Sequence, residues 1–183
     1  MTAAPAAAGS ITGAAVFTDL VGFTEFTALE GDDRAFELLA TQERLVRARL
    51  TPGARIVKEL GDGLFLWFPD AREALCVALE LHDDFEVASD DTGLPLWARV
   101  GVHWGSQRPR GEDLVGHDVN VAARIMQAAG PGEVLASAST AARAGDAPRN
   151  WMAQEIGPVV MKGIPDPIPL VRLERAPSSG PFS

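Results

Sequence analysis

The chain has 183 residues, 46% of them hydrophobic and 22% charged, so it is long enough to bury one sizeable core and is expected to form one domain. Its formal net charge of −9 excludes a broad positive surface for nucleic acid or for an anionic membrane. A phosphate-bearing ligand would therefore need local cations or bound metal ions. The single cysteine, Cys76, excludes a disulfide within the chain.

Both ends of the chain are rich in small and polar residues and contain proline. We therefore expect flexible tails or linkers at 1–12 and 174–183 around one domain at 13–173. The N-terminus has no basic start followed by an apolar stretch, as a secretory signal would. The longest strongly apolar run, at 64–68, is far shorter than the roughly 20 residues that span a bilayer. These features predict a cytoplasmic protein without a membrane segment.

The first part of the chain predicts a strand followed by two helices. Residues 13–19 form an apolar run that favours a strand, and helical spacing follows at 22–30 and 33–50. The second helix is expected to bury one stripe of apolar side chains, which consists of Phe36, Leu39, Leu45, Val46 and Leu50. Pro52-Gly53 ends this region.

The middle of the chain predicts a hairpin, a helix, a strand and a helix. Strands at 54–60 and 64–68 flank the Gly-Asp-Gly turn, and a helix follows at 71–87, with Cys76 and His82 on its buried stripe. A strand at 96–105 precedes a helix at 116–128, whose inward side chains are Val121, Ile125 and Ala128. The order β-α-α-β-β-α-β favours an α+β, ferredoxin-like fold with an antiparallel or mixed sheet covered by helices on one face.

Two aspartates lie at the ends of strands that could be neighbours. Asp19 closes the first apolar strand and Asp62 lies in the hairpin turn, so antiparallel pairing would bring both carboxylates to one edge of the sheet. Such a pair could hold Mg²⁺ or Mn²⁺, which take oxygen ligands and leave positions for phosphates. A turn aspartate or a strand-end cap is the structural alternative for each.

The residues after Asp19 lead directly into a helix. Gly22, Phe23 and Thr24 would form its first turn, where free backbone N–H groups can bind an anion such as a phosphate.

Lysine is scarce, because 14 of the 16 basic residues are arginines and only Lys58 and Lys162 are lysines. Asn120 and Arg124 lie four residues apart, so both project from one face of the helix at 116–128. Taken singly, each of these side chains could simply be solvated, and Asp113 could be a turn residue.

The histidines and tryptophans have structural explanations. His103 and His117 suit a strand and a helix cap better than metal ligation. The indoles of Trp67, Trp97 and Trp104 are expected in the core or in an interface.

Taken in order, five motifs resemble the catalytic domain of class III nucleotidyl cyclases, in particular its short-armed bacterial subset. They extend over about residues 13–173 and read "FTDLVGFTEFT", "VKELGDGLFLWF", "ARVGVHWG", "DLVGHDVNVAARI" and "GPVVMKGIPDPI". Only residues 106–112 stand where many relatives have a longer arm, which leaves the dimer contacts of the arm open.

The resemblance implies a role for each matching residue. Asp19 and Asp62 would hold two divalent cations, and Lys58 and Asp113 would recognise the purine.

On the same basis, Asn120 would orient the ribose, Arg124 would stabilise the transition state and Lys162 would contact the outer phosphates. The resemblance also implies a head-to-tail homodimer, with the two aspartates contributed by one protomer and the other five residues by its partner.

The implied activity is the conversion of ATP to 3′,5′-cyclic AMP and pyrophosphate by two-metal-ion catalysis. Adenine offers a donor at N6 and an acceptor at N1, which Asp113 and Lys58 complement, whereas guanine presents the reverse pattern. The alternative is a catalytically silent, cyclase-like nucleotide-binding module. Polymerases and diguanylate cyclases are less consistent with the sequence, which has no "GGDEF"-type turn and no basic track.

Overall fold

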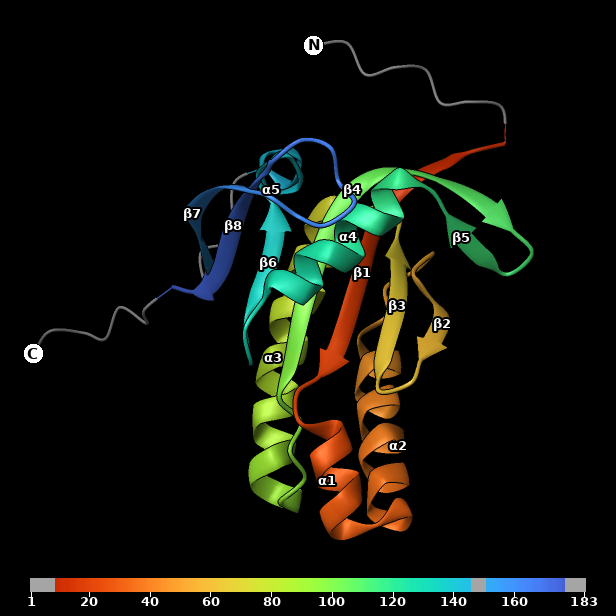
Figure 1. Cartoon of the computed structure of the whole chain (residues 1–183), viewed down its shortest axis with the longest axis vertical. Coiled ribbons are helices and arrows are strands. Elements are labelled where there is room, and N and C mark those ends of the chain that lie inside the picture. The colour runs from red at the N-terminus through yellow and green to blue at the C-terminus, as the bar shows by residue number, and fades with distance from the viewer. Residues whose placement is uncertain (1–8, 146–150, 177–183) are drawn as a thin grey trace, which may run out of the picture.

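The fold is built on an eight-stranded mixed sheet, described by a computed structural model over residues 9–145 and 151–176 (Figure 1). The strands are β1 (Ile11–Leu20), β2 (Arg55–Leu60), β3 (Gly63–Phe68), β4 (Ala98–Arg110), β5 (Asp113–Val115), β6 (Val134–Ser137), β7 (Trp151–Val159) and β8 (Ile168–Arg175). Their order is β2-β3-β1-β4-β6-β8-β7, and β5 pairs with β4. All neighbours are antiparallel except β4 and β6, which are parallel. The predicted α+β class is confirmed.

The helices are α1 (Phe23–Glu30), α2 (Asp32–Arg49), α3 (Ala71–Thr92), α4 (His117–Ala128) and α5 (Ala138–Ala144). The predicted order of elements is therefore confirmed from the first strand to the strand at 96–105, whereas the short strand β5 before α4 was not predicted. In the described residues, α3 continues to Thr92 and ends at Gly93, whose left-handed backbone suits a helix C-terminus.

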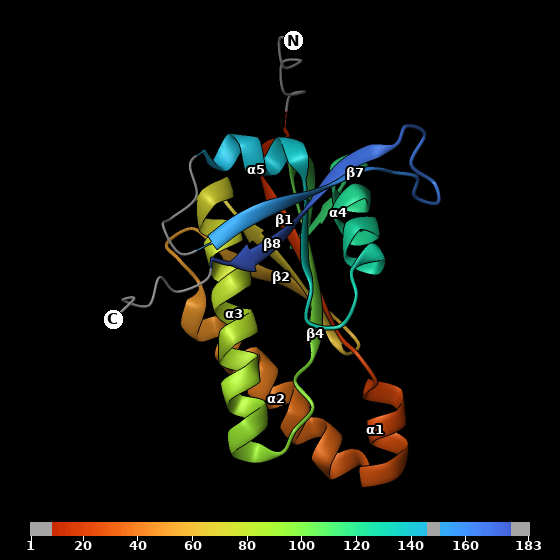
Figure 2. The same cartoon turned by 90° about the vertical axis from the view of Figure 1, so that its left-hand side faces the viewer.

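Helices cover both faces of the sheet, so the expectation of one covered face is wrong (Figure 2). Alternating side chains of β1 explain this arrangement, because Ala14 and Val16 pack in the cluster that contains α2 and α3 residues. Ala15 and Phe17 point the other way and pack with Val119 of α4. The strand is apolar on both sides, which allows a second helical layer.

Helix α4 lies very close to the sheet because β4 carries a glycine beneath it. A Cβ added to Gly101 would lie 2.2 Å from the backbone nitrogen of Met126. On the buried side of α4, Val119, Val121, Ala122 and Ile125 face the sheet and its neighbours. Ala128, predicted to point inward, is exposed.

The expected stripe on α2 is partly wrong. Phe36 is 69% exposed, whereas the buried residues of this helix are Ala35, Leu38, Gln42 and Val46. Val46 is buried as predicted, and Leu39, Leu45 and Leu50 are partly buried against the core, so Phe36 is the misplaced member of the stripe.

On α3, His82 and Cys76 are only partly buried, which corrects the expectation of a core position for both. Trp97 is also outside the core, at 62% exposed. Trp67 and Trp104 do pack against core clusters.

Residues 106–112, predicted to be a short arm, are mostly strand. Strand β4 continues to Arg110. The chain then turns at Gly111 and returns as β5, with Arg110 opposite Asp113. Figure 1 shows this hairpin extending from the side of the molecule that also carries β2 and β3.

Of the predicted tails, residues 1–8 and 177–183 lie outside the described residues. Strand β1 begins at Ile11 and β8 ends at Arg175. Among the described residues, no helix is both long and apolar enough to cross a membrane.

Candidate active site

The two predicted metal ligands lie side by side at one end of the sheet. In the register of β1 and β3, Asp19 is opposite Gly63, so it lies beside Asp62 in the hairpin turn. Burial raises the pKa of Asp62, and the neighbouring negative charge of Asp19 raises it further. Two carboxylates in this relation favour a bound cation.

Neighbouring polar groups hold the strands that carry these acids. Gln42, only 2% exposed, donates from Nε2 to the carbonyl oxygen of Asp62 at 3.3 Å. Thr18 accepts the backbone N–H of Leu64 at its Oγ1, at 3.2 Å. Gln42 was not predicted, although a glutamine within an otherwise apolar stripe of a helix is a signal that it has a buried partner.

Arg99 on β4 also contacts the acidic pair and was missed. It lies opposite Asp19 in the ladder of β1 and β4. Its Nε and Nη2 donate to the same oxygen, Oδ2 of Asp19, at 3.0 and 2.7 Å. Its charge opposes the effect of Asp19 on the pKa of Asp62.

The acidic pair fits divalent metal ions of the hard type. Within residues 9–145 and 151–176, no group of three or more His, Cys, Asp or Glu side chains could hold a metal ion. Mg²⁺ and Mn²⁺ are commonly bound by one or two carboxylates, with water and substrate phosphates as further ligands. Asp19 and Asp62 supply such a donor set.

Lys58 and Asp113, predicted to recognise a purine together, form an ion pair. The Lys58 Nζ to Asp113 Oδ2 distance is 2.6 Å, although the residues are 55 positions apart in sequence. The hydrogen bond from Lys58 is the main cause of the lowered pKa of Asp113. The register of β2 and β3 shifts between Ile56 and Lys58, and after this bulge Lys58 pairs with Phe65.

A groove of about 650 Å³ lies beside this pair, on the α4 side of the sheet. Phe17 and Phe65, whose ring centroids stack 4.4 Å apart, line it together with Lys58 and Asn120. A mostly apolar lining with a few polar groups suits a flat aromatic ligand. Asp19 and Asp62 do not line this groove.

Arg124 and Lys162 lie outside the lining of the groove. Arg124 donates from Nη1 to Oε1 of Gln127 at 2.6 Å. Lys162 is exposed between Met161 and Ile164, which are buried in the cluster that includes residues of α4. The packing of Met161 and Ile164 holds the β7–β8 loop, and with it Lys162, against α4.

Phe23 and Thr24 begin α1, which two residues separate from the end of the strand that carries Asp19. Gly22 is the residue before the helix and has a left-handed backbone, with φ of 76°. The backbone N–H groups of the first turn begin at Phe23, four residues after Asp19 in the chain.

His103 has a structural role, as predicted. It is buried and hydrogen-bonds through Nδ1 to Ser137 Oγ at 2.7 Å and through Nε2 to Asp118 Oδ1 at 3.3 Å. The second oxygen of Asp118 accepts the backbone N–H of Ser106 at 2.7 Å. This network holds α4 against β4. His117, expected to cap the helix, is instead its exposed first residue, and the N-cap is Gly116.

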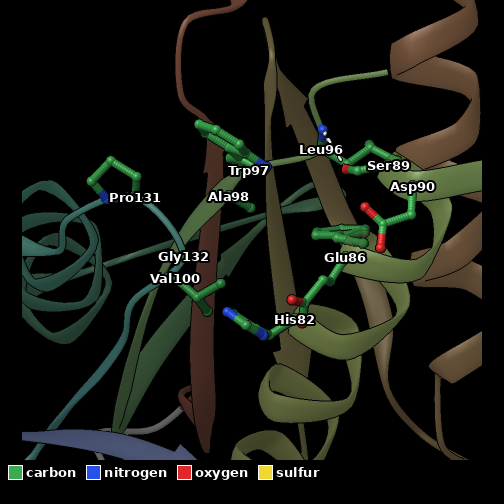
Figure 3. Close-up of a pocket in the computed structure, with 11 residues that line it drawn as sticks. His82, Glu86, Ser89, Asp90, Leu96, Trp97, Ala98, Val100, Pro131 and Gly132 are labelled. Carbon is green, nitrogen blue, oxygen red and sulfur yellow. Dashed lines mark hydrogen bonds between the residues drawn. The ribbon is translucent and has the colours of Figure 1, made fainter. Parts of the chain in front are cut away.

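A second cavity, of about 470 Å³, lies on the α3 side of the sheet (Figure 3). Trp97, His82, Glu86 and Asp90 line it, and Ser89 accepts the backbone N–H of Leu96 there at 3.1 Å. None of the predicted site residues lines this cavity.

Comparison with known proteins identifies a common family. Residues 9–172 match the family described as the adenylate and guanylate cyclase catalytic domain. A pH-sensitive adenylate cyclase of Mycobacterium tuberculosis is 33% identical over 161 residues, which cover 87% of this chain and 40% of that protein. An adenylate cyclase of Streptomyces coelicolor is 37% identical over 144 residues, covering 75% of this chain and 36% of that protein. The chain thus spans two fifths or less of the length of these relatives.

The fold agrees with this match. The crystal structure of the adenylyl cyclase CyaB from P. aeruginosa superposes with a TM-score of 0.80, covering 91% of this chain and 96% of that chain. At 21% identity this likeness concerns the fold.

Proposed function

The chain belongs to the adenylate and guanylate cyclase catalytic domain family, and we propose that it is an adenylyl cyclase that converts ATP to cyclic AMP and pyrophosphate. The observation that carries the choice of ATP is the 2.6 Å ion pair between Lys58, which lines the groove, and Asp113, which precedes the lining residue Leu114. Relatives named adenylate cyclase support the same choice.

The purine edge would be recognised by this ion pair. Asp113 would accept from the N6 amino group of adenine, and the ammonium group of Lys58 would donate to N1. Guanine would oppose its O6 acceptor to the carboxylate and its N1 donor to the ammonium group. Unpaired or opposed polar groups of this kind cost about 1–3 kcal/mol each, which favours ATP.

The reaction would join the ribose 3′-oxygen to the α-phosphorus and release pyrophosphate. Two divalent cations, Mg²⁺ or Mn²⁺, held by Asp19 and Asp62 would lower the pKa of the 3′-hydroxyl and offset triphosphate charge. Asn120 would orient the ribose, and Gly22, Phe23 and Thr24 would bind phosphate oxygens through their backbone. Arg124 would donate to the α-phosphoryl and bridging oxygens as charge develops there, and Lys162 would hold the outer phosphates. Loss of Arg124 should lower turnover about 100-fold or more.

The complete site would require two copies of the chain. The groove with Lys58 and Asn120 does not include Asp19 or Asp62, and apolar side chains of Leu60 and Val115 are exposed at its edge. A head-to-tail homodimer would bring the acids of one protomer to the groove of its partner, giving two equivalent sites. Since ATP is abundant in the cytoplasm, we propose that the domain acts there.

The principal alternative is a silent module that binds a nucleotide without cyclising it. The residues to which the family resemblance assigns metal binding, base recognition and catalysis are all retained in this chain, which favours catalysis.

Incubation of the purified protein with ATP or GTP and either Mg²⁺ or Mn²⁺, followed by chromatography of the products, tests this function. We expect cyclic AMP and pyrophosphate from ATP and much less product from GTP. Binding of ATP without any product would favour the silent module, and predominant cyclic GMP would contradict the base assignment.

A further inference from the structure

Arg99 occupies one of the two oxygens that Asp19 offers. Its Nε and Nη2 both donate to Oδ2, so the lone pairs of this oxygen are engaged by one guanidinium group. The side chains are 32% and 22% exposed, so their attraction is not fully screened by solvent. Arginine also keeps its charge at any physiological pH.

The other oxygen of Asp19 faces the hairpin turn. A Cβ built on Gly63, the residue directly after Asp62 in the chain, would lie 3.5 Å from Oδ1. A divalent ion that joins Asp62 to Oδ1 of Asp19 therefore leaves Arg99 in place. An ion that needs Oδ2 must displace the guanidinium group or share the oxygen with it.

We propose that Arg99 is a built-in cation that competes with one of the two divalent ions for Asp19. This inference rests on the proposed function, in which Asp19 and Asp62 bind two ions. The two carboxylates then form two unequal binding positions, one that is open and one at which Arg99 already binds Oδ2 of Asp19. The ion at this second position would bind weakly until the triphosphate adds its own ligands.

This competition is tested by titrating the protein with Mn²⁺ in the absence of nucleotide. Electron paramagnetic resonance measures the free ion at each step. In the wild type we expect one ion per chain to bind more tightly than the second. Arg99→Gln removes a positive charge next to a doubly charged ion, so the second ion should bind about tenfold or more tightly. Equal or weaker binding of the second ion in folded Arg99→Gln would overturn the proposal.

Two further variants separate charge from geometry. Arg99→Lys keeps the charge, so it should bind the second ion within about threefold of the wild type. A tenfold tightening in Arg99→Lys would contradict competition by charge, and this variant carries the test if circular dichroism shows that Arg99→Gln is unfolded. Arg172→Gln is the matched control, because Arg172 is 33% exposed and pairs with Glu133 at 2.7 Å, and its variant should bind Mn²⁺ as the wild type does.

Asp19→Asn distinguishes failure of this inference from failure of the proposed function. If Asp19→Asn binds Mn²⁺ as the wild type does, the metal site itself is wrong. If Asp19→Asn loses binding while Arg99→Gln matches the wild type, the metal site stands and the role of Arg99 is wrong.

Discussion

At the scale of single residues, the site depends on charged side chains whose partners come from distant parts of the sequence. Lys58 meets Asp113, and Arg99 meets Asp19 across 80 positions. The first pair could be predicted because the resemblance assigns both residues to one purine. The second could not, since an arginine near the start of a strand is usually solvated and only the strand register reveals its partner.

Purine recognition by Lys58 and Asp113 can be tested by replacing both residues. Lys58→Glu with Asp113→Gly would present an acceptor to guanine N1 and remove the carboxylate that opposes O6. We expect the ratio of GTP to ATP turnover to rise by at least about tenfold, measured as kcat/KM for each nucleotide. Glu59→Gln, at the exposed neighbour of Lys58, should leave this ratio unchanged. An unchanged ratio in the double variant would show that the pair does not read the base.

Asp118 should contribute to stability in a pH-dependent way. Burial alone would raise its pKa, but hydrogen bonds from His103 and from the backbone of Ser106 outweigh burial and lower the pKa below its ordinary value. A carboxyl with a lower pKa in the folded state stabilises the protein above the unfolded value, and this contribution is lost as the pH falls through the folded value.

Thermal denaturation of wild type and Asp118→Asn between pH 7 and pH 3 measures this contribution. We expect the variant to be less stable by about 1–3 kcal/mol at pH 7, with the difference shrinking below about pH 4. Asp91→Asn, at an exposed position, is the control. A difference that stays constant over this range would mean that the charge of Asp118 is not involved.

At the scale of elements, the helices and strands up to α4, apart from the short strand β5, follow from apolar spacing and turn residues. The hairpin of β2 and β3 was predictable from its Gly-Asp-Gly turn. Burial within the helices was less predictable, since Gln42 is buried for its hydrogen bond while Phe36 is exposed. The position of α4 on the second face depends on the small residue Gly101, which propensity does not reveal.

Gly101→Ala should therefore displace the helix that carries Asn120 and Arg124. The added Cβ would meet backbone atoms of Met126, which cannot rotate away as a side chain could. We expect a loss of about 2–3 kcal/mol in unfolding free energy and a marked loss of cyclase activity.

Gly130→Ala is the matched control for this substitution. Its Cβ would meet only the side chain of Glu133, at 3.2 Å, and that side chain can move. Equal stability of the wild type and Gly101→Ala in chemical denaturation would contradict the close packing of α4 on β4.

At the scale of the whole molecule, one chain carries both parts of the proposed site. The acids lie at the hairpin turn, and the groove lies between β5, α4 and the stacked phenylalanines. The sequence resemblance predicted this division, and the parts after α4 were left undefined because short strands such as β6 have little pattern of their own. The domain limits at 13 and 173 stay a prediction.

Mixing two inactive variants tests most directly the claim that two copies share each site and cyclise ATP there. Asp19→Ala removes an acid and Arg124→Ala removes the transition-state cation, so each homodimer should be nearly inactive. After exchange of protomers in an equal mixture, half of the dimers would be mixed and each would keep one intact site, restoring about a quarter of wild-type cyclic AMP formation.

Asp19→Ala mixed with Asp62→Ala is the control, because both changes lie in the same half of the site and no intact site can form. Recovery to about a quarter in the first mixture and none in the second is the predicted result. The account would be contradicted if the first mixture, with protomer exchange demonstrated, formed no more cyclic AMP than the separate variants.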